Sequence, residues 1–473
     1  SDSGVIPIRI INNMIRFITI LVIFNSVFAA FVSETDALKV AQNLFLERNK
    51  TDEGFLVQKV DVVKEENINL YYIFHLSPKG FIIVSSENRA LPILGYSFEN
   101  NFLIENQPGN ISYLMNLFKS EILEVVSQNQ IQKNEIKDKW KKYLTDKFIP
   151  NKSLRNVSPL IGCRMNQDYP WNAMCPVDGN GPGNHVYAGC VAVSMAQIMH
   201  YWSYPQVGYG SHGYNSGYGY LQVNYSQQTY DFSAMPGNVA TEETQKLLYH
   251  AGIGVEMGYG ADGSGAWVGY GNVNAKSVLE EHFLYDSGIS YTDNYQNTQS
   301  YRNIIENNLD SNRPLISRGC SNSGCHAWNL DGYEGDMIHS NFGWGGSNNG
   351  YYSLSSMGGF GSDQGIIYNI VPSSLETPRL TLSSYSSSEI DGDMDNVINP
   401  GESFELITTI ESMIPWDDAY NVNATLVANN DLLSLETDSF IVGLINAGDN
   451  YTNTNLPFII NIDENIDLGQ YNL

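Results

Sequence analysis

The stretch AGCVAVSMAQIMHYW, residues 188–202, places a cysteine at the start of an apolar helical pattern. Residues at the spacing of a core-facing helix side follow it, namely Val191, Met195, Ile198 and Trp202. A thiol at a helix amino terminus gains thiolate character from the helix dipole, and Gly189 leaves room for a substrate backbone. The stretch therefore predicts a helix whose first turn carries Cys190 as a nucleophile. The alternative is a buried structural cysteine.

The sequence also supplies groups that could activate this thiol. SGCHAWNLDGYEG places His326 before an apolar strand, and MIHSNFGWGG leads through a second strand to Asn341. In a thiol protease the cysteine attacks a carbonyl, the histidine moves the proton and the asparagine orients the imidazole. Upstream, the Gln167 amide can donate to a developing oxyanion beside the Cys190 backbone N–H. This set of residues predicts acyl-transfer chemistry on a carbonyl substrate.

Five stretches carry a resemblance to a known family: NQDYPWNAMCP, GCVAVSMAQIMHYWSYP, LLYHAGIGVEMGYG, GCHAWNLDGY and HSNFGWGGSNNGYYSL. Together they resemble the streptopain family of secreted bacterial cysteine proteases. Upstream, GFIIVSSENRALPILGYS resembles that family's inhibitory propeptide. The resemblance implies a papain-like fold, a zymogen, polypeptide substrates and the chain's own prodomain as intramolecular inhibitor. It implies no required cofactor.

The resemblance also implies residue roles. Cys190 matches the nucleophile, His326 the general base and acid, Asn341 the orienting amide and Gln167 the oxyanion-hole glutamine. Residues implied to bind substrate or support the site are Trp344, Phe342, Gly189, Gly324 and Met257. The chain departs from the family pattern where Phe342 and Met165 replace tryptophans. These departures concern rate and specificity rather than mechanism.

The predicted fold class is α+β, with several domains along the 473 residues. Residues 1–13 are expected to be non-native, and 14–29 form a signal peptide with a short apolar core. The predicted domains are a small α+β inhibitory prodomain (31–135), a linker with the activation cleavage (136–155), a papain-like catalytic domain (156–374) and an all-β, Ig-like sandwich module (378–473). The last module stops within a strand pattern, so the chain is expected to be a fragment.

Charge and hydropathy limit the partners and the location. The formal net charge is −26, which opposes binding to nucleic acid because phosphate contacts need clustered Lys and Arg. The sequence predicts no transmembrane segment, since the apolar run of residues 17–24 is too short to span a bilayer. The protein is expected to be secreted or at the cell surface, where disulfides form. The candidate pairs are Cys163 with Cys175 and Cys320 with Cys325.

Two sets of residues in the sequence have side chains that can bind a metal ion. DGDMDNVINPGE, residues 391–402, offers hard oxygen ligands for a structural calcium, namely Asp391, Asp393, Asp395 and Glu402. The alternative for this stretch is a solvated acidic turn. A zinc site built on Cys163, Cys175, His185 and Cys190 fits no zinc spacing.

An alternative function belongs to another class: a catalytically silent surface or adhesion protein that keeps the protease scaffold. The intact set Cys190, His326, Asn341 and Gln167 favours the enzyme, because a silent scaffold has no chemical use for it. The other histidines are assigned non-catalytic places, His185 and His200 at the surface or packed and His339 as a support of Asn341. The glycine-rich residues 258–266 are expected to border the substrate cleft.

Overall fold

The computed structural model describes residues 31–469, apart from 50–53, 106, 322–323, 362, 374–377, 379, 396 and 413–416. The predicted signal peptide and the residues before it lie outside the described residues. The chain forms two compact units, up to Val371 and from Pro372 onward, each considered by itself below. In the described part of the chain no helix is both long and apolar enough to cross a membrane.

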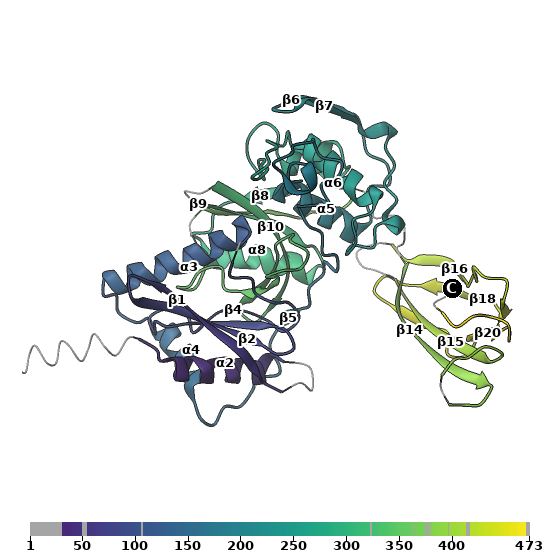
Figure 1. The fold of residues 1–473 in the computed structure, drawn as a ribbon, viewed down its shortest axis with the longest axis horizontal. Coiled ribbons are helices and arrows are strands. Elements are labelled where there is room, and N and C mark those ends of the chain that lie inside the picture. The colour runs from purple at the N-terminus through teal and green to yellow at the C-terminus, as the bar shows by residue number, and fades with distance from the viewer. Residues whose placement is uncertain are drawn as a thin grey trace, which may run out of the picture. The chain divides into compact units, whose positions relative to one another are not determined.

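The N-terminal segment, residues 31–155, is an antiparallel sheet with α3 on one side and α2 and α4 on the other (Figure 1). Its elements are α2 (Glu34–Arg48), β1 (Val57–Glu65), β2 (Ile68–Leu76), β3 (Phe81–Ser85), β4 (Ile93–Ser97), α3 (Gly109–Ser127) and α4 (Asn134–Leu144). Strands β2, β3 and β4 are buried almost throughout, and α2 begins at a Ser33 cap whose side chain accepts from the Asp36 N–H. The α+β prediction for this segment is confirmed.

Helix α4 differs from the prediction that residues 136–155 form a linker. Ile136, Trp140 and Tyr143 follow helical spacing and are buried, while the lysines between them point outward. The Trp140 indole N–H donates to the Ala90 carbonyl at 2.8 Å, and the Tyr143 hydroxyl donates to Glu47 at 2.6 Å. The irregular connection therefore begins at residue 145, because three apolar residues were enough to anchor a helix in a Lys-rich stretch.

The central segment, residues 156–371, holds two groups of elements. Helices and a hairpin form the first group: α5 (Cys190–Trp202), β6 (Ser211–Ser216), β7 (Gly219–Asn224), α6 (Glu242–Gly254) and α7 (Ala275–Glu281), with 3-10 turns at Pro182–Asn184, Tyr225–Gln227 and Phe232–Ala234. Strands with one helix form the second: β5 (Asn156–Val157), β8 (Ser290–Thr292), α8 (Thr298–Asp310), β9 (Leu315–Ser321), β10 (Gly324–Glu334), β11 (Met337–Asn341), β12 (Gly350–Tyr352) and β13 (Gln364–Tyr368).

One sheet runs through both segments, in the order β1-β2-β3-β4-β12-β11-β10-β9-β13-β8, with β5 on β10. The junction is antiparallel, with Tyr351 opposite Tyr96 and Tyr352 opposite Gly95. A Cβ on Gly95 would lie 2.6 Å from the Tyr352 ring, so the absence of a side chain lets the two strands meet. Helix α3 contacts β9 and β10 of the central segment. Backbone pairing therefore fixes the N-terminal segment on the strands that carry His326 and Asn341.

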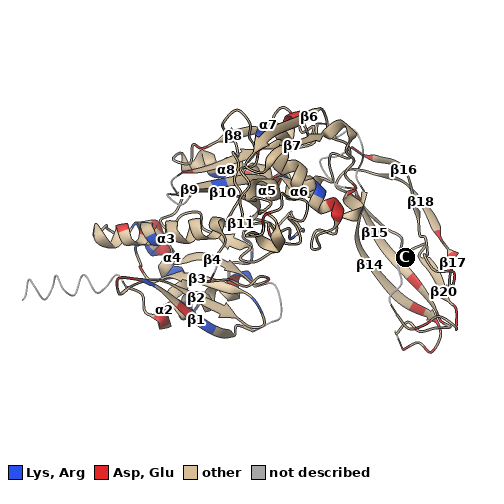
Figure 2. Ribbon diagram, turned by 45° about the horizontal axis from the view of Figure 1, so that its top comes forward, with Lys and Arg blue, Asp and Glu red and all other residues tan. Residues whose placement is uncertain are grey.

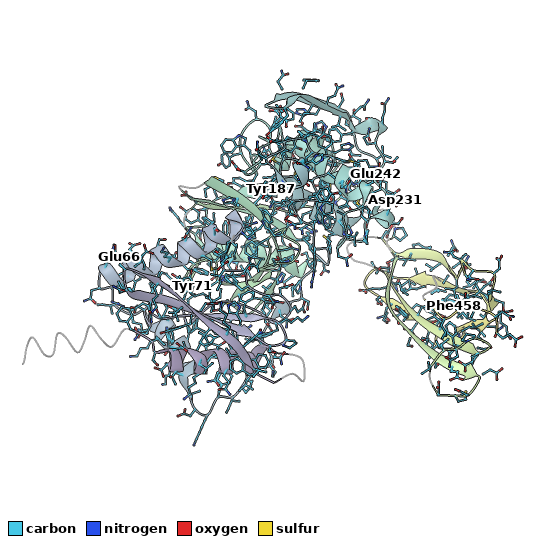
Figure 3. The ribbon with its side chains drawn as sticks, in the orientation of Figure 1. Glu66, Tyr71, Tyr187, Asp231, Glu242 and Phe458 are labelled. Atoms are coloured by element: carbon cyan, nitrogen blue, oxygen red, sulfur yellow. A yellow bond between two sulfur atoms is a disulfide. The ribbon has the colours of Figure 1, made fainter. Side chains whose placement is uncertain are left out.

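The second unit is all β, as predicted. Its strands are β14 (Leu380–Asp391), β15 (Ser403–Ser412), β16 (Ala419–Thr425), β17 (Leu433–Thr437), β18 (Ser439–Ile445), β19 (Asn450–Thr452) and β20 (Phe458–Ile462). The sheet β14-β15-β20-β17 packs against the pair β16-β18, with Phe440 stacked on Tyr451 and tilted against Phe458 (labelled in Figure 3). From residue 380 on, the unit has acidic residues but no Lys or Arg (Figure 2).

Candidate active site

Helix α5 presents Cys190 as its first residue, as the sequence predicts. The preceding Gly189 has a φ of 92°, in the left-handed region that favours glycine. A Cβ there would lie 2.6 Å from the Met257 side chain, so this residue packs directly against the turn that leads into Cys190. The geometry places the sulfur at the positive end of α5.

A cavity of about 520 Å³ opens at Cys190, and His326, Gln167 and Trp344 line it as well. The Gln167 carbonyl accepts from the Ala188 N–H at 3.0 Å, which ties the glutamine to the entry of α5. Trp344 packs edge-on against Tyr187, whose position beside α5 can be followed in Figure 3. The four residues come from separate stretches of the chain and meet around one space.

The glycine-rich loop also reaches this cavity. Gly263 and Ser264 line it, and Gly258 pairs with Gly265 to close the loop. Its predicted position beside the cleft therefore agrees with the structure.

His326 lines this cavity but is not paired with the thiol. A Cβ built on Gly109 of the N-terminal segment would lie 2.1 Å from the His326 Cε1, so the imidazole lies directly against that backbone. Among the described residues, no hydrogen bond joins His326 to Cys190 or to Asn341. The Cys190 sulfur instead accepts from the Ala327 N–H at 3.4 Å. The described residues therefore show the site in a state without a thiol–imidazole hydrogen bond.

Burial favours the neutral form of both groups. Desolvation raises the pKa of the Cys190 thiol above its usual range, although backbone N–H groups of Ala327 and Val191 oppose this. Desolvation also lowers the pKa of the His326 imidazole below its usual range. A thiolate–imidazolium pair would need both pKa values to move the other way. The described state is thus a resting one.

Asn110 of the N-terminal segment bridges the ends of the two paired strands of the site. It is buried, and its side-chain amide donates to the Ala327 carbonyl at 3.2 Å and to the Phe342 carbonyl at 2.7 Å. These carbonyls belong to the residues directly after His326 and Asn341. Sequence reasoning missed Asn110, because an asparagine near a helix start is ordinary capping chemistry and nothing in the sequence links it to β10.

Asn341 does not have its predicted partner in this state. Its side-chain oxygen accepts from Gln197 at 3.0 Å and from the Gly343 N–H at 3.2 Å, and its amide donates to the Cys163 carbonyl at 3.3 Å. Gln197, on α5, also accepts from the Asn329 side chain at 2.9 Å. This buried amide network joins α5, β10 and β11. The His326–Asn341 contact stays a prediction for the enzyme freed of its N-terminal segment.

The remaining residues predicted for the site differ in whether they line the cavity. Phe342 is buried against Tyr352 and Trp328, outside the lining of the cavity. Gly324 is exposed, with a φ of 125°, in the hairpin before His326. His339 forms a buried contact of 2.6 Å with Asp331, which supports β11 as expected. His185 and His200 each hydrogen-bond a backbone carbonyl.

Comparison with known proteins matches two parts of the chain to two families. Residues 165–352 match the Peptidase C10 family, and residues 29–122 match the Spi protease inhibitor family. Residues 165–352 form a peptidase C10 domain. The prediction of a cysteine-type peptidase is thereby confirmed, and the sequence before the C10 domain is of the inhibitor type.

Relatives cover different shares of the chain. Thiol protease/hemagglutinin PrtT from Porphyromonas gingivalis is 27% identical over 385 residues, covering 74% of this chain and 43% of PrtT. Streptopain from Streptococcus pyogenes is 27% identical over 377 residues, covering 72% of this chain and 89% of streptopain. The match thus spans less than half of PrtT's own length. A Prevotella intermedia prointerpain A fragment has a TM-score of 0.54 at 24% identity, covering 66% of this chain and 98% of that one, and shows the shared fold.

The cysteines of the C10 domain follow one predicted pairing and not the other. Cys320 and Cys325 form a disulfide, since they face each other across β9 and β10 just before His326. The prediction for Cys163 and Cys175 is wrong, because both are free and buried. Cys163 lies against Gly237, whereas Cys175 contacts the Tyr259 hydroxyl, so the two thiols have different surroundings.

The buried thiol gives the first testable expectation. In the intact chain we expect Cys190 to react slowly with iodoacetamide at pH 7, with the rise in rate shifted to higher pH than for an ordinary thiol, because the thiolate reacts and burial disfavours it. Peptide mapping by mass spectrometry separates Cys190 from Cys163 and Cys175. A rate midpoint near neutral pH in the intact chain would contradict the resting state.

The acidic loop of the second unit only partly matches the calcium prediction. Carboxylate oxygens of Glu389, Asp393 and Asp395 lie within 4.8 Å of one another. Glu389 replaces the predicted Asp391, which is exposed, and Glu402 accepts from the Asn399 N–H at 2.7 Å instead of joining the cluster. Calcium at this loop stays a prediction.

A thermal experiment checks it. If the loop takes calcium, millimolar Ca²⁺ should raise the Tm of the second unit in the whole chain by a few degrees, since binding to the folded state alone is stabilising. The double variant Asp393→Asn, Asp395→Asn should remove the increase. An increase of equal size in the variant would assign the effect to another site.

Proposed function

We propose that the chain is the zymogen of a secreted cysteine endopeptidase that hydrolyses extended polypeptides. The observation that supports this is the meeting of Cys190, His326 and Gln167 around one cavity, with Gly109 and Asn110 of the N-terminal segment seated against the histidine and its strand. A C10 domain preceded by an inhibitor-type sequence fits the same role. The secreted location rests on the predicted signal peptide.

The proposed mechanism begins when the N-terminal segment leaves. His326 then turns toward Cys190 and takes the thiol proton, and the thiolate attacks the substrate carbonyl. The Gln167 amide and the Cys190 N–H donate to the oxyanion. The imidazolium protonates the leaving amine, and His326 next deprotonates a water molecule that hydrolyses the thioester. Asn341 would orient the imidazole once the N-terminal segment, and Asn110 with it, has left the site.

An epoxide that traps activated thiols tests this function. We expect the processed protein to be labelled at Cys190 and to hydrolyse casein, whereas the intact chain does neither at a comparable rate. If Cys190 of the processed protein reacts no faster than an ordinary thiol, the peptidase proposal fails. The alternative, a catalytically silent surface or adhesion protein, would then stand.

Release of the N-terminal segment would follow a cut in residues 145–155. The segment has no helix or strand there, and most of its residues are exposed, including Ile149 at 85%. Irregular exposed chain is what a protease cleft can bind in extended form. Amino-terminal sequencing of the mature product would identify the bond that is cut.

Arg48 is the main charged anchor of the N-terminal segment on the central one. It is buried, its guanidinium donates to the Glu334 carbonyl at 2.8 Å, and it lies 3.8 Å from the Glu334 carboxylate. The Tyr96 hydroxyl donates to the same carboxylate at 2.7 Å, and Lys139 pairs with Asp336. Side chains from three elements of the N-terminal segment thus hold the β10–β11 turn.

Replacing Arg48 by methionine should therefore speed activation. Removal of one partner from a buried ion pair typically costs about 3–5 kcal/mol, because the other charge is left uncompensated. We expect self-processing of the intact chain to rise at least about tenfold, the equivalent of 1.4 kcal/mol. The matched control is Lys59→Met, which breaks an exposed pair with Asp61 on β1. Equal rates in the two variants would contradict the anchoring role.

A further inference from the structure

The charges around the cleft are all of one sign. Among the described residues that line the cavity, Asp168 and Asp262 carry carboxylates, and none is Lys or Arg. Asp168 directly follows Gln167, and its carbonyl accepts from the Trp171 and Asn172 N–H groups, which fixes its backbone in a turn. Asp262 belongs to the glycine-rich loop. The Gly260 carbonyl of this loop accepts a hydrogen bond from the Tyr187 N–H at 3.4 Å. Both acids thus sit on backbone tied to the approach to Cys190.

Neither carboxylate has a cation of its own. No ion pair in the described part of the chain joins Asp168 or Asp262 to Lys, Arg or His. Asp168 is half-buried, and desolvation raises the pKa of its carboxyl above the usual range. A half-buried anion without a counter-charge is stabilised by any cation that enters the cavity. A positively charged group of a substrate would therefore be bound favourably in this cleft, because none of the described lining residues is Lys or Arg.

The chain's own substrate segment has that charge. Residues 133–155 hold eight of the 25 Lys and Arg residues of the protein: Lys133, Lys137, Lys139, Lys141, Lys142, Lys147, Lys152 and Arg155. Lys147, Lys152 and Arg155 fall in the irregular, exposed residues 145–155. A second copy of the enzyme would thus meet a basic segment at the place where activation requires a cut.

We infer that the cleft selects polypeptides with a Lys or Arg side chain next to the scissile bond, and that Asp168 and Asp262 bind that side chain. This rests on the proposed peptidase function and names its substrate class. A carboxylate shielded from water binds an ammonium or guanidinium more strongly than a fully exposed one, so Asp168 should contribute more than Asp262. An acidic side chain at the same position is repelled.

The test uses the processed wild-type enzyme and fluorogenic peptides that are identical except for Lys, Arg, Gln or Glu beside the scissile bond. We expect kcat/KM for Lys and Arg to exceed that for Gln by at least about fivefold, and Glu to fall below Gln. Raising the salt concentration should shrink the ratio, since ions screen such contacts. Equal kcat/KM for the Lys and Gln peptides would overturn the inference while leaving the peptidase function standing.

Variants assign the preference to the two residues. Asp168→Asn and Asp262→Asn should each lower the Lys/Gln ratio, and Asp168→Asn should lower it more. Glu242→Gln is the matched control, because it removes one exposed negative charge outside the cleft lining. A Lys/Gln ratio that neither cleft variant changes relative to this control would overturn the assignment. Failure of the peptidase function itself would look different: no peptide of the set would be cut.

Discussion

Replacing Cys190 by alanine is expected to abolish both self-processing and hydrolysis of casein, a loss of about a thousandfold or more. The reason is that the proposed acyl-enzyme needs the sulfur, and Cys190 is the one cysteine among the described residues that line the cavity. The intact chain should then persist at full length during expression and incubation. Mass measurement over time, with a casein assay, follows both losses.

The control for this variant is Cys163→Ala. Cys163 is likewise a free and buried cysteine, but it does not line the cavity that contains Cys190. Its substitution removes a thiol with a similar cost in packing and should leave processing intact apart from any loss of stability. If Cys190→Ala still processed itself at the wild-type rate, the nucleophile would be another residue and the proposed function would fall.

Local patterns were enough to predict the parts of the site. The 3.6-residue spacing after Cys190 predicts α5, and the glycine before it predicts the tight entry, because both signals lie within a few residues of the thiol. The strands with His326 and Asn341 follow from short apolar runs in the same way. The cavity that joins them follows from the family resemblance and not from any one stretch.

Contacts between distant segments could not be predicted in this way. Asn110 reaches carbonyls more than two hundred positions away, where the contacts of α3 with β9 and β10 and the pairing of β4 with β12 hold the N-terminal segment. Helix α4 was missed because its apolar residues are few among many lysines, and their partners lie on α2 and beside β4. Sequence reasoning thus reached the local elements that carry the predicted site residues but not the contacts between distant segments.

The resting state has a simple electrostatic basis. Gly109 of the N-terminal segment lies against His326, and the desolvation of Cys190 and His326 in this state favours the neutral thiol and the neutral imidazole. In the proposed mechanism removal of the N-terminal segment returns water and lets the two groups share a proton, and the helix dipole and the imidazolium then stabilise the thiolate. Covering the site and holding the histidine away from the sulfur therefore act in the same direction.

Asn110→Ala is expected to have a large effect on activation of the intact chain. Its amide makes two buried hydrogen bonds to the strands of the site, each contributing roughly 1 kcal/mol, and alanine makes neither. The state in which His326 is free should become about ten- to a hundredfold more populated, since each 1.4 kcal/mol is a factor of ten. Epoxide labelling of Cys190 in the intact chain, and the rate of self-processing, should both increase by that factor.

Asn100→Ala separates this effect from a general loosening of the interface. Asn100 also belongs to the N-terminal segment and also donates to a carbonyl of the central one, Asn349, at 3.2 Å, but it does not line the cavity. If inhibition depends only on how tightly the segments bind, the two variants should activate similarly. If inhibition depends on the Asn110 amide, only Asn110→Ala should label quickly. That amide bonds the residue after His326 and the residue after Asn341, whereas Asn100 bonds neither. Equal, slow labelling of both variants would show that Gly109 and the paired strands keep the site closed without Asn110.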